Sequence, residues 1–291
     1  MVPAAGASRG PVVIVIGIDD TDTLHGPGTN QLARRIAAAL PPGYALESIV
    51  RHQLLFDPRI PYTSKNGSAS LVVRVERAGA EGETGGTQRD APGPEGGHDR
   101  RHPARPSGGT RAAVPEELIA LVRAVMLEHF QPGSDPGLCV AWANAVPRAV
   151  IEFALRSKRE PVRQSEAREI ARAAGIYLEG LGGTEDGVIG ALAAVGLRAT
   201  GEDGRVVHME GWTWPDAFAG PQPVAAVLAR GVAEIVERET GRVITDGVVH
   251  IGKHLRPAYR GGRAVLFVER VDAAPADDPG NGAGWRALKL E

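Results

Sequence analysis

The chain has 291 residues and nearly balanced charge, with 33 lysines and arginines against 35 aspartates and glutamates, for a formal net charge of −2. This balance excludes the global basic field that draws many proteins to nucleic acid, so a nucleic-acid surface would have to be local. The single cysteine, Cys139, excludes an intramolecular disulfide and a cysteine-based zinc site within the chain. No apolar run approaches the roughly 20 residues that span a bilayer, and we expect a cytoplasmic protein without membrane contact.

The first predicted elements are a buried strand and a helix. Residues 12–17 form a continuous apolar, β-branched run that is typical of a buried strand. Leu32, Ile36 and Leu40 recur every four residues and predict a helix over about 30–40. Thr29 stands where an N-cap is expected, because its side-chain oxygen can accept a hydrogen bond from an amide of the first turn.

A segment that cannot contribute to a core follows. Residues 78–113 are rich in glycine and proline and contain no large apolar side chain, so we expect a disordered insertion. Around it the patterns predict strands over 45–56, 68–76 and 138–143 and a helix over 115–130.

The pattern starts again after Pro147, where residues 149–156 are ambiguous between helix and strand. A glycine-rich turn at 180–187 leads into a helix of small residues, and Asp203-Gly204 indicates a hairpin because both residues tolerate positive φ angles. The remaining patterns predict helices over 165–174 and 223–239 and strands near 243–251, 263–271 and 285–291.

Hairpins mixed with helices predict an α+β fold. We place one domain at residues 12–146 and a second at 147–291.

The first predicted strand leads into a cluster of carboxylates, Asp19, Asp20 and Asp22. In extended geometry Asp20 and Asp22 project to one side and Asp19 to the other. Two carboxylates on one side suit Mg²⁺, which completes its coordination with waters and substrate phosphates. These aspartates are therefore candidate magnesium ligands.

The glycines that follow complete a candidate nucleotide site. Gly26 and Gly28 let backbone amides approach an anion closely, and the helix near Thr29 points its free N–H groups and positive dipole end at the same place. The alternative is an Asx-type turn in which both glycines serve only the chain reversal. Neither a Walker A loop nor a dinucleotide fingerprint is present here.

Two later loops add further candidate binding residues. Lys65 and Asn66 precede Gly67, and a lysine there can neutralise phosphate charge, although a solvated turn lysine is the alternative. In "GGTEDG", Thr184 is expected to cap the next helix and Asp186 to face the nucleotide. Asp186 equally suits the positive end of that helix.

The motifs "IGIDDTD", "GPGTNQLA", "DPRIPYTSKNGSASLVVRVE", "DPGLCVAW" and "GGTEDGVIGALAAVGLRATGEDG" resemble the archaeal tRNA-isoleucine 2-agmatinylcytidine synthetase family. The likeness covers roughly residues 12–76 and 134–270. It implies a kinase-like ATP-binding domain followed by a ferredoxin-like domain. Where the family commonly has a cysteine and paired threonines, this sequence has Gly28, Thr29 and Asn30. We expect the chain to lack the OB-fold and zinc ribbon that follow in the family.

The resemblance implies an enzyme that uses ATP and Mg²⁺ to activate the wobble cytidine of a tRNA, after which the amine of agmatine displaces the activated oxygen. It implies that Thr29 is phosphorylated and that Asp19, Asp20 and Asp22 position the metal and the phosphates. A small molecule could replace tRNA as the acceptor. A hypothesis from another class is a non-catalytic nucleic-acid-binding or regulatory module on the same fold.

Overall fold

The structure is a computed structural model that describes residues 12–19, 28–60, 66–76, 113–212, 214, 218–271 and 284–289. The predicted insertion at 78–113 lies outside these residues, apart from its last one. No helix in the described part is both long and apolar enough to cross a membrane.

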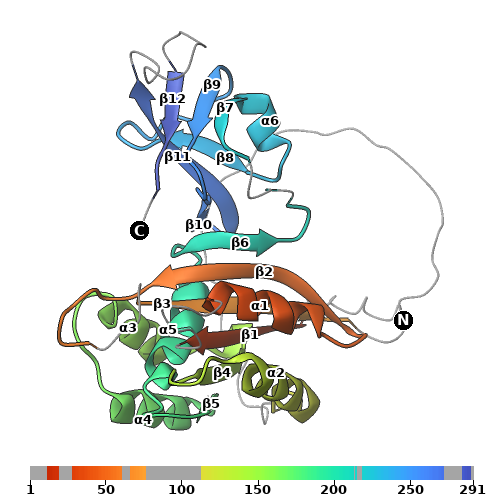
Figure 1. Cartoon of the computed structure of the whole chain (residues 1–291), viewed down its shortest axis with the longest axis vertical. Coiled ribbons are helices and arrows are strands. Elements are labelled where there is room, and N and C mark those ends of the chain that lie inside the picture. The colour runs from red at the N-terminus through yellow and green to blue at the C-terminus, as the bar shows by residue number, and fades with distance from the viewer. Residues whose placement is uncertain are drawn as a thin grey trace, which may run out of the picture.

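One mainly antiparallel sheet runs through the described residues (Figure 1). Its strands, in spatial order, are Tyr177–Gly180 (β5), Gly137–Trp142 (β4), Val12–Asp19 (β1), Gly67–Val75 (β3), Tyr44–Gln53 (β2), Arg205–Met209 (β6), Ala258–Arg260 (β10), Arg263–Val271 (β11), Gly284–Ala287 (β12), Val248–Ile251 (β9) and Gly220–Pro223 (β7), while Glu234–Glu237 (β8) pairs with β11. The helices are Thr29–Ala38 (α1), Glu116–His129 (α2), Arg148–Arg156 (α3), Gln164–Ala174 (α4), Gly187–Thr200 (α5) and Val224–Leu228 (α6), with a 3-10 turn at Ala143–Ala145 (η1). Helices combined with a large sheet confirm the predicted α+β class.

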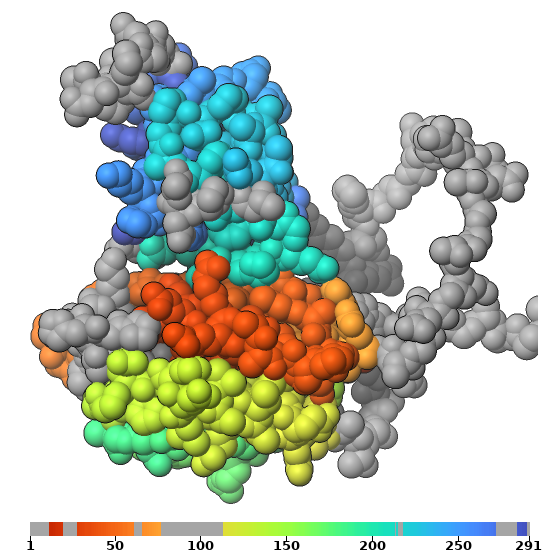
Figure 2. Space-filling view, turned by 45° about the vertical axis from the view of Figure 1, so that its right-hand side comes forward, coloured from red at the N-terminus to blue at the C-terminus, as the bar shows by residue number. Residues whose placement is uncertain are grey.

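The two faces of β1 carry different helices. Ile14, Ile16 and Ile18 are fully buried in a core shared with α1 and α2, which lie side by side in Figure 2. Val15 and Gly17 alternate with them and face α3, α4 and α5 instead. The apolar run at residues 12–17 is uninterrupted because helices cover both faces of β1.

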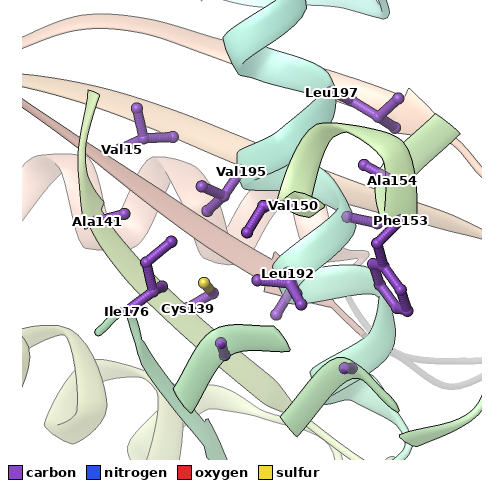
Figure 3. Close-up of a cluster of buried hydrophobic side chains, with 14 of the residues drawn as sticks. Val15, Cys139, Ala141, Val150, Phe153, Ala154, Ile176, Leu192, Val195 and Leu197 are labelled. Atoms are coloured by element: carbon purple, nitrogen blue, oxygen red, sulfur yellow. The ribbon is translucent and has the colours of Figure 1, made fainter. Parts of the chain in front are cut away.

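The core on the α5 side is dense (Figure 3). It brings together Val15 of β1, Val150 and Phe153 of α3, and Leu192 and Val195 of α5. Cys139 is fully buried in the same cluster, and burial raises the pKa of its thiol. This cysteine therefore acts as a small hydrophobic side chain.

Helix α5 lies unusually close to β1. A Cβ on Gly17 would overlap the carbonyl oxygen of Ala191 and would lie 3.0 Å from Cγ2 of Val195. The helix is buried almost all round because α3 packs on it as well, near Gly196. Small residues on α5 are therefore required by packing on both sides.

The predicted boundary at 146/147 falls just before α3. Helices α3, α4 and α5 lie beyond it in sequence, yet they share a core with β1 and β3. The two-domain division stays a prediction, and the packing groups residues 148–200 with the first predicted domain.

A buried polar network joins this part to the strands that follow. His52 of β2 is fully buried, with Nδ1 2.9 Å from Oδ1 of Asp203 and Nε2 2.8 Å from Oγ of Ser70. Lys158 also binds Asp203. Nearby, the guanidinium of Arg198 lies over the ring of Tyr259, 4.5 Å from its centroid. The end of α5 is thus tied to both β2 and β10.

Two predictions of secondary structure were wrong. No hairpin forms around Asp203-Gly204, because residues 197–200 continue α5, which ends at the left-handed Gly201. The helix predicted over 223–239 stops at Leu228, because Gly231 takes a positive φ of 91° and the chain then forms β8 beside β11. In both places a glycine conformation and a non-local strand pairing override the local apolar pattern.

The contact of α5 with β1 predicts an intolerant glycine. We expect Gly17→Ala to lower the free energy of unfolding by about 1–3 kcal/mol, because its methyl group would overlap the backbone of Ala191. Gly182→Ala is the control, since the nearest atom is Cδ of Pro136, 4.0 Å away. Urea unfolding of both variants measures the difference, and equal stability of the two would contradict the packing described.

His52 predicts a pH dependence of stability. Burial lowers its pKa, and the charges of Lys158 and Arg198 act in the same direction against the bond to Asp203. The unfolded chain therefore takes up a proton below about pH 6.5 that the folded chain does not bind, so stability falls on acidification by up to about 1.4 kcal/mol per pH unit.

The measurement is urea unfolding of wild type and His52→Asn between pH 5 and 7, where His52→Asn should show a flatter dependence. His208 contributes with the same sign, because burial and Arg34 lower its pKa, so some slope remains. Hydrogen bonding lowers the pKa of Asp203 to about 2 despite its burial, so its contribution is constant in this range. His129→Gln, at the end of α2, is the control.

Candidate functional site

The candidate site begins where β1 ends, at Asp19. This residue is the last of β1 and pairs with Gly137, the first residue of β4. Its side chain lies against Gly190 of α5, and the residue is only 8% exposed. The strand alternation predicted from the sequence thus places Asp19 on the α5 face of the sheet.

The first turn of α5 meets the same end of the sheet. A Cβ on Gly137 would overlap the backbone of Gly187, so strand and helix touch through their main chains. The N–H of Gly187 donates to the carbonyl of Asp135 at 3.0 Å, and the N–H of Leu181 donates to that of Pro136 at 2.7 Å. The loop before α5 is therefore fixed to the start of β4.

Asp135 holds the "GGTEDG" loop through its side chain as well. Its carboxylate accepts hydrogen bonds from the N–H of Thr184 at 2.7 Å and from the hydroxyl of Thr184 at 2.8 Å. Thr184 was predicted to cap α5, but the N-cap position belongs to Asp186, whose side chain makes no cap hydrogen bond. The Thr184 hydroxyl donates to Asp135, far away in sequence, and accepts from the N–H of Asp186 at 3.4 Å, so it contacts the start of α5 without holding the N-cap position.

The same loop holds a residue in an uncommon conformation. Glu185 has a φ of 62°, in the left-handed region that non-glycine residues rarely adopt. Its carboxylate pairs with Arg168 of α4, and its side chain lies against Gly180. Such backbone strain is often found at functional sites, where the surrounding structure enforces it.

Thr29 begins α1 on the opposite face of the sheet. It is buried, at 8% exposed, and the N-cap residue is Gly28, whose carbonyl accepts from the N–H of Gln31 at 2.8 Å. The prediction of Thr29 as N-cap was therefore wrong by one residue, because Gly28 takes the extended cap conformation. No acidic residue lies in the first turn, so the positive end of this helix favours an anion.

Two buried polar atoms near these segments have no hydrogen-bond partner in the described structure. One is Oδ1 of Asn30, directly after Thr29, and the other is Oγ of the fully buried Ser68. Ser68 precedes Ala69, which pairs with Ile18 of β1. Unpaired buried oxygens are costly, and a ligand with hydroxyl or amine groups at the start of α1 would satisfy the Oδ1 of Asn30. The acceptor at the start of α1 suits the hydroxyl and amine groups of a nucleotide.

The remaining predicted residues are placed unevenly. Asn66 lies in front of β3, and its side chain donates to the carbonyl of Leu55 at 2.8 Å, which gives it a local role. Asp20, Asp22, Gly26 and Lys65 lie outside the described residues. Among the residues described, no three acidic, histidine or cysteine side chains form a group that could hold a metal. Magnesium does not require such a group, because phosphates and waters supply most of its ligands.

Asp135 was missed by the sequence reasoning. Its role depends on contact with Thr184, 49 residues later, which no local pattern reveals. The only signal was its place three residues before an apolar strand, within "SDPGLCVAW".

The model of the family described as "TiaS TCKD domain" matches residues 15–182. No curated protein matches the chain.

Solved structures similar to this chain include a tRNA fluorescent labeling enzyme and two TiaS complexes. The labeling enzyme is 23% identical, with a TM-score of 0.43, 63% of this chain covered and 36% of that chain. The complex of TiaS with an isoleucine tRNA, AMPCPP and agmatine is 23% identical, with a TM-score of 0.42, 64% of this chain covered and 36% of that chain. The complex of TiaS with an isoleucine tRNA and ATP is 16% identical, with a TM-score of 0.44, 96% of this chain covered and 72% of that chain. The match to the first two thus spans about a third of their length.

The anchoring of the loop before α5 can be tested at Asp135. We expect Asp135→Ala to cost about 1 kcal/mol of stability and to speed hydrogen exchange at the amide of Thr184, because that amide loses its acceptor. Asp57→Ala is the control, since the carboxylate of Asp57 binds Arg59, only two residues away. Unchanged exchange at Thr184 in Asp135→Ala would refute the anchoring role.

Proposed function

The chain belongs to the TiaS TCKD family, because the model of that family matches more than half of it, and on this premise we propose that it is an ATP-dependent enzyme. It would activate an acceptor through phosphoryl transfer and then let an amine displace the activated oxygen. The family match over residues 15–182 is the observation that carries the proposal. We propose with it the finer fold description, a kinase-like domain followed by a ferredoxin-like domain.

The nucleotide would bind between the end of β1 and the start of α1. Asp19, Asp20 and Asp22 would hold the magnesium ion, which when bound would neutralise charge on the phosphates. Gly26 and Gly28 would allow the backbone to approach those phosphates. The unpaired Oδ1 of Asn30 supports this position, because it offers a buried acceptor next to the helix start.

Thr29 would accept the phosphoryl group. Its hydroxyl stands on the first residue of α1, where the helix dipole stabilises negative charge, so a phosphate on this oxygen would be favoured. Lys65 would assist as a cation, and Asn66, Thr184 and Asp186 would contribute to nucleotide binding. For Thr184 the hydrogen bonds to Asp135 make this role one of fixing the loop.

The acceptor would be a cytidine of tRNA or a small molecule, and the amine would be agmatine or a relative of it. Of the TiaS complexes named above, one contains an isoleucine tRNA, AMPCPP and agmatine and the other an isoleucine tRNA and ATP, so these are the compounds to test first. The formal net charge of −2 leaves a small-molecule acceptor open.

The test is incubation of the purified protein with ATP and Mg²⁺, followed by mass spectrometry of the intact protein and of its peptides. We expect one added phosphate on Thr29. It should be lost in Thr29→Ala and in Asp20→Ala, because the first removes the acceptor oxygen and the second a metal ligand. Thr200→Ala is the matched control, since this threonine lies at the far end of α5.

Binding measurements separate the remaining possibilities. Nucleotide binding without phosphate on Thr29 would show that Thr29 serves only the helix start. Failure to bind or hydrolyse ATP, combined with salt-dependent RNA binding, would replace the enzyme by the non-catalytic module.

A further inference from the structure

Helix α5 meets the end of β1 at one residue, Gly190, which lies against the side chain of Asp19. A Cβ on Gly190 would lie 2.9 Å from the Cβ of Asp19 and would overlap its Cγ and Oδ2. Gly190 is itself buried, so no solvent space exists into which a side chain could turn. Only glycine at this position leaves room for the Asp19 carboxylate where it now lies.

Helix α5 cannot move away to make that room. On the sheet side it is fixed by main-chain contact with Gly17 of β1 and with Gly137 of β4. On the other side a Cβ on Gly196 would already press against Ala154 and Val150 of α3. Because the helix is held between the sheet and α3, a side chain at residue 190 would displace Asp19 instead of the helix.

The contact also restricts where the carboxylate can turn. Asp19 is 8% exposed and follows the buried residues of β1, so its side chain has α5 on one side and the strand ends on the other. On the α5 side, Gly190 limits the space that is open to the carboxylate. The position of the carboxylate oxygens therefore depends on a residue that cannot itself bind metal or phosphate.

We propose that Gly190 is a positioning residue that sets the orientation of the Asp19 carboxylate toward bound Mg²⁺ and ATP. The inference rests on the proposed function, in which Asp19 is one of the magnesium ligands. Neighbours that orient a metal ligand typically contribute 10–100-fold to metal affinity. Gly190 acts in this way by leaving space, not by donating a hydrogen bond.

The experiment compares Gly190→Ala with Gly196→Ala, two substitutions on the same helix that both introduce a methyl group into a tight contact. Only the first contact involves Asp19. We expect Gly190→Ala to weaken binding of Mg·ATP by about 10-fold or more, measured by isothermal titration calorimetry. Gly196→Ala should lower the melting temperature but leave the affinity for Mg·ATP unchanged.

A double-mutant cycle adds a readout that does not depend on nucleotide. In Asp19→Ala the atoms that collide with residue 190 beyond the Cβ are gone, so Gly190→Ala should lower the melting temperature less in that background than in wild type. If Gly190→Ala does not fold, recovery of folding in the Asp19→Ala/Gly190→Ala double variant supports the contact. Equal losses in both backgrounds overturn it.

The binding measurements distinguish failure of the proposed function from failure of the positioning role. Wild-type protein that does not bind Mg·ATP removes the proposed function and this inference with it. Wild-type protein that binds Mg·ATP, with Gly190→Ala binding it equally well, removes only the positioning role.

Discussion

The main-chain contact of α5 with β1 and β4 is the constraint on which the rest of this structure depends. Gly17 faces Ala191 and Gly137 faces Gly187 without any side chain between them. These contacts bring the helix close to the sheet, and α3 packs on its other side. Its first turn then comes level with the end of β1, so the packing of the core and the construction of the candidate site have the same cause.

The two ends of α5 contact different parts of the molecule. Its N-terminal turn lies at Asp19 and at the loop fixed by Asp135, whereas its C-terminal end is tied to β10 by Arg198 over Tyr259. The buried His52–Asp203 pair adds a second connection at that end, made of polar groups that are stable only while each is hydrogen-bonded. Helix α5 thus connects the candidate site with the place where β10 pairs with β6 (Figure 1).

Sequence reasoning succeeded where a local pattern determines the structure. The apolar run at 12–17 and the four-residue spacing of Leu32 and Ile36 predicted β1 and α1 to within two residues at each end. It failed where a distant contact decides. Residues 234–237 form a strand because they pair with β11. The hydroxyl of Thr184 donates to the carboxylate of Asp135, 49 residues earlier. In the sequence, nothing distinguished Gly17 from the other residues of the strand, because the carbonyl that it contacts belongs to Ala191, far away in the chain.

Asp19 and Thr29 lie on different faces of the sheet. Asp19 is buried against α5, while Thr29 begins a helix on the opposite face. If extended geometry continues past Asp19, Asp20 and Asp22 are predicted to project to the side opposite Asp19. In the proposed site, Asp19 would reach the metal from the α5 side. In the proposed site the acidic motif would therefore contribute from both sides of the strand end, and the helix behind Asp19 would bear on the chemistry proposed for Thr29.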